Sequence, residues 1–228
     1  LAEAISKLDN LISLAEKVKA HKDFEKVDEE LKNQLSEEII KAKTAVINKD
    51  LEEIERSTYT ISTVLANDQF ADIVADVRDE IANDLRGKLE EIINGDKAFR
   101  KTVKYTKAQT SFKEAYEKAQ EAAREILNKD DASDEELKEA YDNLSKAVKD
   151  LDGDQYKDRL QALATKYKEN SDKITDAKVK AEIEEKINAL VADDKTMDDL
   201  VEVETQLKNA LPKDGAKVTA QTTGSGTV

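Results

Sequence analysis

The feature that most constrains the fold is the spacing of apolar and small residues between positions 112 and 151. They recur three and four positions apart in two runs, which the polar segment 128–132 separates. The first run is Phe112, Ala115, Tyr116, Ala119, Ala122, Ala123, Ile126 and Leu127. The second run is Leu137, Ala140, Tyr141, Leu144, Ala147, Val148 and Leu151. A helix with this period carries one apolar stripe, so the runs predict two amphipathic helices that pair as an antiparallel hairpin.

Short polar motifs mark the ends of the second of these helices. Ser133 is followed three residues later by Glu136, the pattern of a capping box in which each side chain accepts a hydrogen bond from the other's backbone N–H. Gly153 stands where a left-handed residue would close the helix. The shared groove of such a hairpin needs a third helix to cover it. The upstream candidate carries Leu89, Ile92 and Ile93.

The same apolar spacing continues on both sides of the hairpin. It predicts three helices within residues 1–66 and three more within residues 154–212, the last of which ends at Pro212. Between the first set and the hairpin, the pattern from Phe70 to Ile92 predicts one continuous connecting helix. Gly87 lies inside this helix but weakens it by only ~1 kcal/mol relative to alanine.

We therefore predict an all-α protein of tandem three-helix bundles arranged as an elongated rod. The register of the last helices supports repetition, because aligning Ile54, Leu137 and Leu200 also aligns the later apolar positions of all three. The alternative is that any amphipathic helices would align in this way. With one proline and six glycines the chain is poor in turn residues, which disfavours a sheet protein. The predicted divisions are bundles at 1–66, at 67–153 with the long connecting first helix, and at 154–212, followed by a flexible linker or tail at 213–228.

Composition narrows the function classes. The chain has no cysteine, so disulfides and thiolate metal sites are excluded. A net charge of −14 argues against nucleic acid and anionic membranes as partners, and no run approaches the ~20 apolar residues of a membrane span. His21 is the only histidine, and we expect an exposed loop or helix-end residue there. The acidic segment 150–154 lacks the residue order of an EF-hand. We predict no catalytic residue, no cofactor and no metal.

Residues from about 86 to 153 resemble a FIVAR module, the three-helix repeat of Gram-positive surface proteins and secreted carbohydrate-active enzymes. The matching features are a Leu-rich first helix, the Tyr105-Thr106 pair, the small-residue stripe Ala115, Ala119 and Ala123, the turn at Asn128, and the Ser133–Glu136 box. The resemblance implies a surface or extracellular setting and a binding or spacing role, and it supplies no catalytic residue. The chain departs from the family pattern in its first loop, where a basic insertion occurs.

This basic segment is the candidate partner-binding site. It consists of Lys97, Arg100, Lys101, Lys104, Tyr105 and Lys107, on a chain that is otherwise acidic. One interpretation is a contact for an acidic partner, since electrostatic contrast steers encounters. The other, which we favour, is a solvated loop whose aromatic residues Phe99 and Tyr105 pack into the bundle. If the loop makes no contact, the helix face from Glu117 to Arg124 is the next candidate.

The chain opens inside a helix without a signal sequence, so we expect a fragment of a longer protein. The FIVAR resemblance implies that this protein is bacterial, cell-wall-anchored or secreted, and we predict that the fragment is non-catalytic. The predicted role is adhesion or binding of a host extracellular or serum protein by a monomer. Two alternatives remain, a passive stalk or spacer and an accessory module of a secreted carbohydrate-active enzyme.

Overall fold

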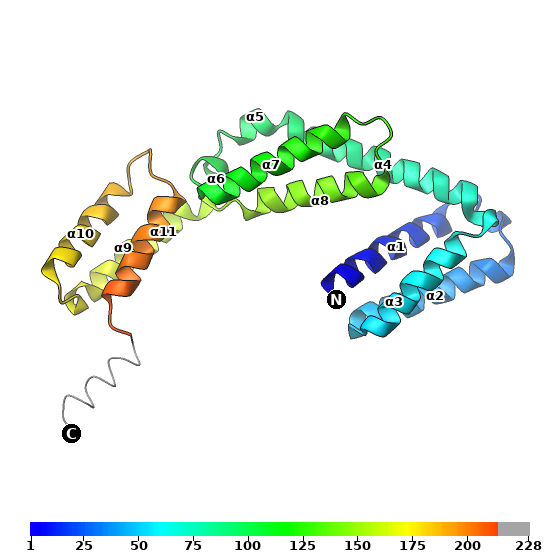
Figure 1. Cartoon of the computed structure of the whole chain (residues 1–228), viewed down its shortest axis with the longest axis horizontal. Helices are drawn as coiled ribbons and strands as arrows, with labels where there is room; N and C mark the ends of the chain where they lie inside the picture. Colours follow the sequence, from blue (N-terminus) through cyan, green and yellow to red (C-terminus); the bar gives the residue numbers. More distant parts are fainter. Residues whose placement is uncertain (214–228) are drawn as a thin grey trace, which may run out of the picture. The chain divides into compact units, whose positions relative to one another are not determined.

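The computed structural model describes residues 1–213, and this part of the chain is all-α without a strand (Figure 1). The predicted tail at 213–228 lies outside the described residues, apart from Lys213. The helices are α1 (Ala2–Ala20), α2 (Glu29–Asn48), α3 (Leu51–Leu65), α4 (Ala71–Asn94), α5 (Asp96–Phe99), α6 (Val103–Thr106), α7 (Thr110–Leu127), α8 (Asp134–Asp150), α9 (Tyr156–Asn170), α10 (Ala177–Ala189) and α11 (Met197–Ala210). Single 3₁₀ turns are η1 (Phe24–Lys26), η2 (Asp68–Phe70), η3 (Gly153–Gln155) and η4 (Ser171–Lys173).

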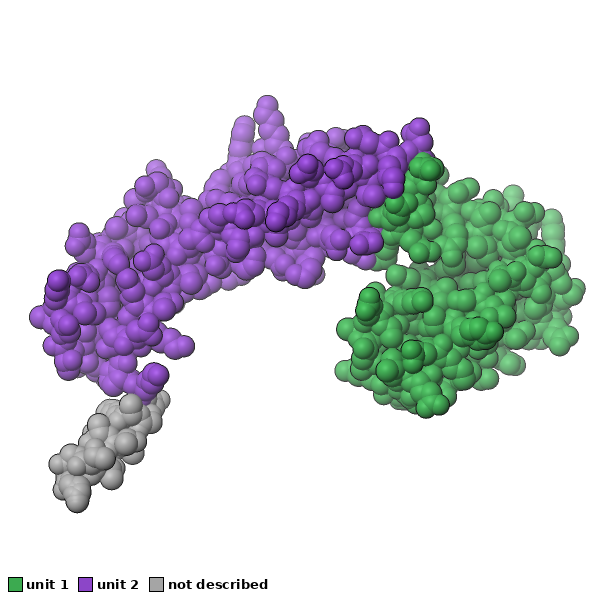
Figure 2. Space-filling model, in the orientation of Figure 1, with its two compact units in different colours: residues 1–88, 131–138 green, residues 89–130, 139–228 purple. Residues whose placement is uncertain are grey.

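The chain forms two compact units (Figure 2). Unit 1 contains Leu1–Lys88 and Asp131–Lys138, and unit 2 contains Leu89–Asp130 and Glu139–Val228. Helices α4 and α8 each contribute to both units. The finer division into bundles at 1–66, 67–153 and 154–212 stays a prediction.

The core of unit 1 lies between α1, α2 and α3 and extends into the start of α4. Its fully buried residues include Leu8, Leu35, Ile54 and Ile61, which fall at the predicted apolar spacing. Phe70 is fully buried beyond the predicted boundary at residue 66, and its ring stacks on Phe24 with centroids 6.3 Å apart. This core therefore depends on the chain that follows its third helix.

In unit 2, α9, α10 and α11 enclose a core of their own (Figure 1). Leu163, Ile183, Leu200 and Leu207 are buried in it. The buried hydroxyl of Tyr156 donates a 2.6 Å hydrogen bond to the carbonyl oxygen of Leu190 at the end of α10. Burial raises the pKa of Tyr156, so this hydroxyl holds its proton and stays a donor.

Several local predictions are confirmed. The long connecting helix is continuous as α4, Ala71–Asn94, with Gly87 inside it. The capping box at the start of α8 is present, since Glu136 N–H donates to Ser133 Oγ at 3.1 Å and Ser133 N–H donates to Glu136 Oε1 at 3.1 Å. Helix α11 ends at Ala210, two residues before Pro212, because proline cannot continue the hydrogen-bond ladder.

Gly153 does not close helix α8 in a left-handed conformation, so the prediction for this residue is wrong. Helix α8 ends at Asp150, and Gly153 begins the turn η3 without a left-handed φ. A Cβ at this position would lie 2.1 Å from the carbonyl oxygen of Val103 and 2.5 Å from that of Lys104. Glycine is needed here because two backbone segments approach too closely for any side chain.

Candidate functional site

The basic segment forms two short helices, α5 and α6, rather than an open loop. Of its six candidate residues, Lys97 and Lys101 are exposed, whereas Arg100, Lys104, Tyr105 and Lys107 are half-buried. The four half-buried side chains all contact other parts of unit 2, as the following paragraphs describe.

Arg100 belongs to a network of side chains that ties α5 to α7. Its Nε donates to Asp96 Oδ1 at 3.0 Å, and its Nη1 donates to Glu117 Oε1 at 2.9 Å. The hydroxyl of Tyr105 donates to the same Glu117 oxygen at 3.1 Å. The charge of Arg100 is therefore balanced within the chain by two carboxylates.

An aromatic cluster lies beneath this network. Phe99 and Tyr105 both contact Tyr116, with ring centroids 5.3 and 5.7 Å apart. Tyr116 is only 1% exposed, and its hydroxyl donates to Asp96 Oδ1 at 2.6 Å while accepting from Gln120 Nε2 at 2.9 Å. Burial and the bond to Asp96 raise the pKa of Tyr116. The fold thus encloses both the ring and the hydroxyl of Tyr116.

Lys104 and its neighbours bind the segment that leaves α8. Lys104 Nζ donates to the carbonyl oxygen of Leu151 at 3.0 Å. Asp152 is 6% exposed and accepts two bonds from Gln109, one from the backbone N–H at 2.9 Å and one from Nε2 at 2.7 Å. Gly153, the next residue after Asp152, lies directly against the backbone of α6.

Lys107 reaches the loop between α10 and α11. Its Nζ donates to the carbonyl oxygens of Asp193 at 2.9 Å and of Ala192 at 3.4 Å, and also to that of Lys195. The ammonium lies 5.0 Å from the ring centroid of Tyr156, which is a cation–π distance. The ammonium is therefore held among backbone carbonyl oxygens of the α10–α11 loop by charge-assisted hydrogen bonds.

Three further bonds reinforce this contact at the starts of α7 and α11. The backbone N–H of Met197, at the start of α11, donates to the carbonyl oxygen of Lys107 at 2.8 Å. The backbone N–H of Thr110, at the start of α7, donates to Asp198 Oδ2 at 3.0 Å, and Thr110 Oγ1 donates to the same oxygen. The first N–H groups of a helix have no partner within it, so Asp198 of α11 caps the start of α7, and the carbonyl of Lys107, in the segment before α7, caps the start of α11. We call residues 104–110, 151–153 and 192–198 the clasp.

Unit 1 uses the equivalent loop in a similar way. Between α1 and α2, Asp28 accepts from Gln69 Nε2 at 2.9 Å and donates its N–H to Gln69 Oε1 at 2.9 Å. His21 Nε2 lies 3.0 Å from Asp76 Oδ2, and its Nδ1 accepts from the N–H of Asp23. His21 lies at the end of α1, as predicted, but its side chain is only 12% exposed, so the predicted exposure is wrong. The first loop of each helical set thus holds the chain that follows its third helix.

The sequence did not identify the acidic half of the clasp. Asp152 was considered only as part of the acidic segment 150–154, and Asp198 was not singled out, because acidic residues are abundant throughout the chain. Lys107 binds the carbonyl oxygen of Asp193, which is separated from it by 86 positions in the sequence. No short-range pattern signals a pairing over that separation.

Within residues 1–213, no group of three or more His, Cys, Asp or Glu side chains is arranged to hold a metal ion. No helix in this part of the chain is long and apolar enough to cross a membrane.

Comparison with known families identifies the repeat. The FIVAR domain family matches residues 4–67 and 86–152, which together exceed half of the chain. The first match adds a second copy to the resemblance that the sequence indicated near 86–153. No curated protein and no solved structure matches the chain. The chain therefore belongs to the FIVAR family and carries two FIVAR domains.

Proposed function

We propose that this chain is a spacer of a bacterial surface protein, in which the clasp holds the second FIVAR domain and the C-terminal helices as one stiff element. FIVAR domains are non-catalytic modules found in extracellular or surface-associated bacterial proteins. The observation that carries the proposal is the bonding of the α6–α7 segment to α11 and the loop before it through Lys107, Thr110 and Asp198.

The internal contacts of the half-buried cations of the basic segment support a role that needs no external partner there. Arg100, Lys104 and Lys107 direct their charged groups to acceptors inside the chain. A cation that binds such acceptors loses part of its capacity to attract a distant acidic surface. A spacer needs this kind of internal bonding, because a joint with several directional hydrogen bonds resists bending where a free linker does not.

Pulsed electron spin resonance tests the stiffness of the joint. The chain contains no cysteine, so cysteines introduced at the exposed Glu121 on α7 and Glu185 on α10 would carry the only spin labels. We expect a narrow distance distribution for this pair. The double variant Lys107→Met and Asp198→Ala should broaden it, because the first change removes the ammonium bonds to the α10–α11 loop and the second removes the side-chain cap of α7.

The matched control is Lys118→Met with Asp158→Ala, which changes the same residue types at exposed positions outside the clasp. This control should keep the narrow distribution. A parent distribution as broad as that of the clasp variant would refute a stiff joint, and with it the spacer proposal.

A second candidate function is adhesion through a helix face, with a host extracellular or serum protein as partner. It is favoured by Ile40 and Ile47 on α2, which are 66% and 79% exposed and seven residues apart, hence on one face of the helix. Surface plasmon resonance with purified serum and matrix proteins tests it. Binding that survives Lys97→Ser with Lys101→Ser but falls with Ile40→Ser and Ile47→Ser would support a helix-face contact, whereas no binding by the parent would reject this function.

A further inference from the structure

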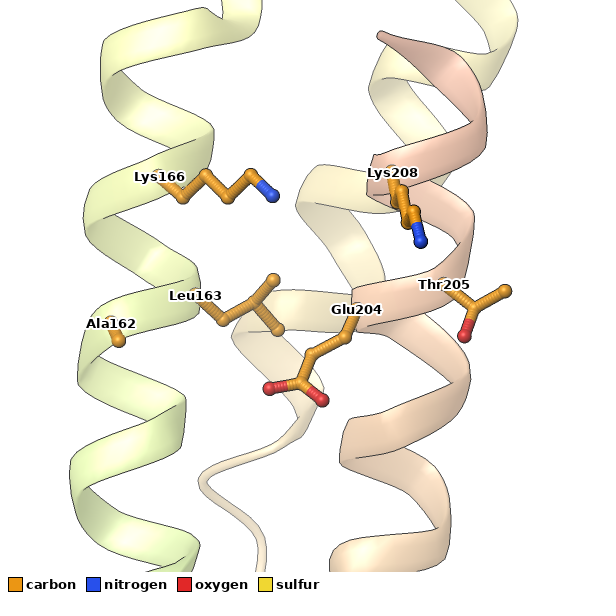
Figure 3. A pocket seen from close by; sticks show the side chains of 6 residues that line it. All are labelled: Ala162, Leu163, Lys166, Glu204, Thr205 and Lys208. Carbon is orange, nitrogen blue, oxygen red and sulfur yellow. The ribbon is translucent and has the colours of Figure 1, made fainter. Parts of the chain in front are cut away.

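We propose that the groove between α9 and α11 is a docking site for an acidic amphipathic segment of a partner protein. The groove has a volume of about 270 Å³ and is lined by Ala162, Leu163, Lys166, Glu204, Thr205 and Lys208. Figure 3 shows Leu163 and Lys166 projecting from α9 toward α11, with Glu204, Thr205 and Lys208 on the facing helix. This site goes beyond the spacer function, since the clasp does not include it.

Two lysines flank the groove without an acidic partner. Within residues 1–213, neither Lys166 nor Lys208 forms an ion pair, and both are exposed. The nearest carboxylate along α11 is Glu204, four residues before Lys208, a spacing at which helix pairs normally form. Glu204 is bound instead to Arg159, whose Nε donates to it at 3.2 Å and whose Nη2 donates to its other oxygen. Arg159 thus removes the acid that would have neutralised Lys208.

This pair of cations is unlike the basic segment of residues 97–107. There the half-buried cations bind acceptors inside the chain, whereas Lys166 and Lys208 present two free ammonium groups beside one groove. At physiological ionic strength the Debye length is ~8 Å. Carboxylates elsewhere on the acidic chain are therefore screened, and the local lysines decide the attraction.

The floor of the groove selects a protein segment over a simple polyanion. Leu163 is 4% exposed and forms an apolar floor between the charged side chains, and the exposed Ala162 lines the edge of the groove. The volume is below the ~300 Å³ at which pockets for small molecules begin, so it suits one or two side chains. A helix that carries a leucine ridge between glutamates offers both the apolar group and the carboxylates. A sulfated glycan offers only the anions.

Fluorescence anisotropy with a synthetic peptide tests the proposal on the full chain. The probe is a labelled helical peptide with leucines on one face and flanking glutamates, and its control is a scrambled peptide of the same composition. We expect Lys166→Glu with Lys208→Glu to weaken binding of the probe by about tenfold or more, since each change replaces an attraction with a repulsion. Ala162→Gln should weaken it about threefold by adding bulk at the edge of the groove without changing charge.

The matched control is Lys168→Glu with Lys178→Glu, which makes the same charge change on exposed lysines outside the groove. It should alter the affinity for the peptide by less than about twofold, because Lys168 and Lys178 do not line the groove and charges outside it are screened by salt. Circular dichroism of each variant checks that the helices are intact. Equal affinity for the parent and for the Lys166/Lys208 variant would overturn the proposal. Equal affinity for the scrambled peptide, or for heparin as a sulfated glycan, would show a general polyanion surface and would also overturn it.

Discussion

Replacing Gly153 with alanine should open the clasp, while the same replacement at Gly87 should stabilise the protein. At position 153 the added Cβ would lie 2.1 Å from the carbonyl oxygen of Val103, 2.5 Å from that of Lys104 and 2.8 Å from the amide nitrogen of Ala108. All three neighbours are backbone atoms, so no side-chain rotation can relieve the contact. Reaching even a 3.0 Å separation from Val103 requires a displacement of about 0.9 Å.

The energetic cost follows from what that displacement disturbs. Overpacking in a close-packed site costs about 1–3 kcal/mol. A shift of this size also weakens the bond from Lys104 to Leu151 and the pair of bonds between Gln109 and Asp152. Hydrogen bonds to charged groups contribute about 1.5–3 kcal/mol each, and a shifted bond loses part of this. We therefore expect Gly153→Ala to lower the free energy of unfolding of unit 2 by about 2–4 kcal/mol.

Gly87 is the matched control because it lies inside α4 with no atom within 4 Å of an added Cβ. Alanine there should raise stability by about 0.5–1 kcal/mol through helix propensity alone. Urea unfolding followed by far-ultraviolet circular dichroism measures both variants. Hydrogen exchange at the amides of Gln109, Thr110 and Met197 locates the effect, since these N–H groups are bonded within the clasp. If Gly153→Ala leaves stability and exchange unchanged, the close approach is not rigid and the reasoning fails.

Three other predictions concern single side chains. Ser57→Ala should stabilise unit 1 by about 1 kcal/mol in urea unfolding, because the buried hydroxyl has no hydrogen-bond partner and alanine favours a helix; a loss of stability would show that the hydroxyl is satisfied. Ser133→Ala should cost about 1 kcal/mol by removing the cap of α8, and an unchanged melting curve would contradict it. Tyr116 has a raised pKa in the folded protein, so the unfolded chain ionises first above pH ~10 and stability should fall as pH rises. Tyr116→Phe should lessen this decline in alkaline urea titrations, and an equal decline in both proteins would refute the assignment.

The sequence by itself determined the helices and their caps. Apolar spacing located the amphipathic helices, and the Ser133–Glu136 box and the continuous α4 were predicted correctly. These features depend on residues within one or two helical turns, so their physical causes are present in any short window of the chain. The FIVAR resemblance over 86–153 was recognisable for the same reason, since the motif consists of helix stripes and caps.

Only the tertiary structure decided what the charged residues do. Lys107 and Asp198 bind groups more than eighty residues away, whereas Lys166 and Lys208 come together at one groove without a partner. Long charged side chains can reach many neighbours, and the acidic chain offers each lysine many carboxylates with similar local spacing. The same limit applies to Gly153, because its need for glycine comes from the backbone of α6 rather than from its own dihedral angles. Which backbone or carboxylate lies within reach is fixed only when the helices pack.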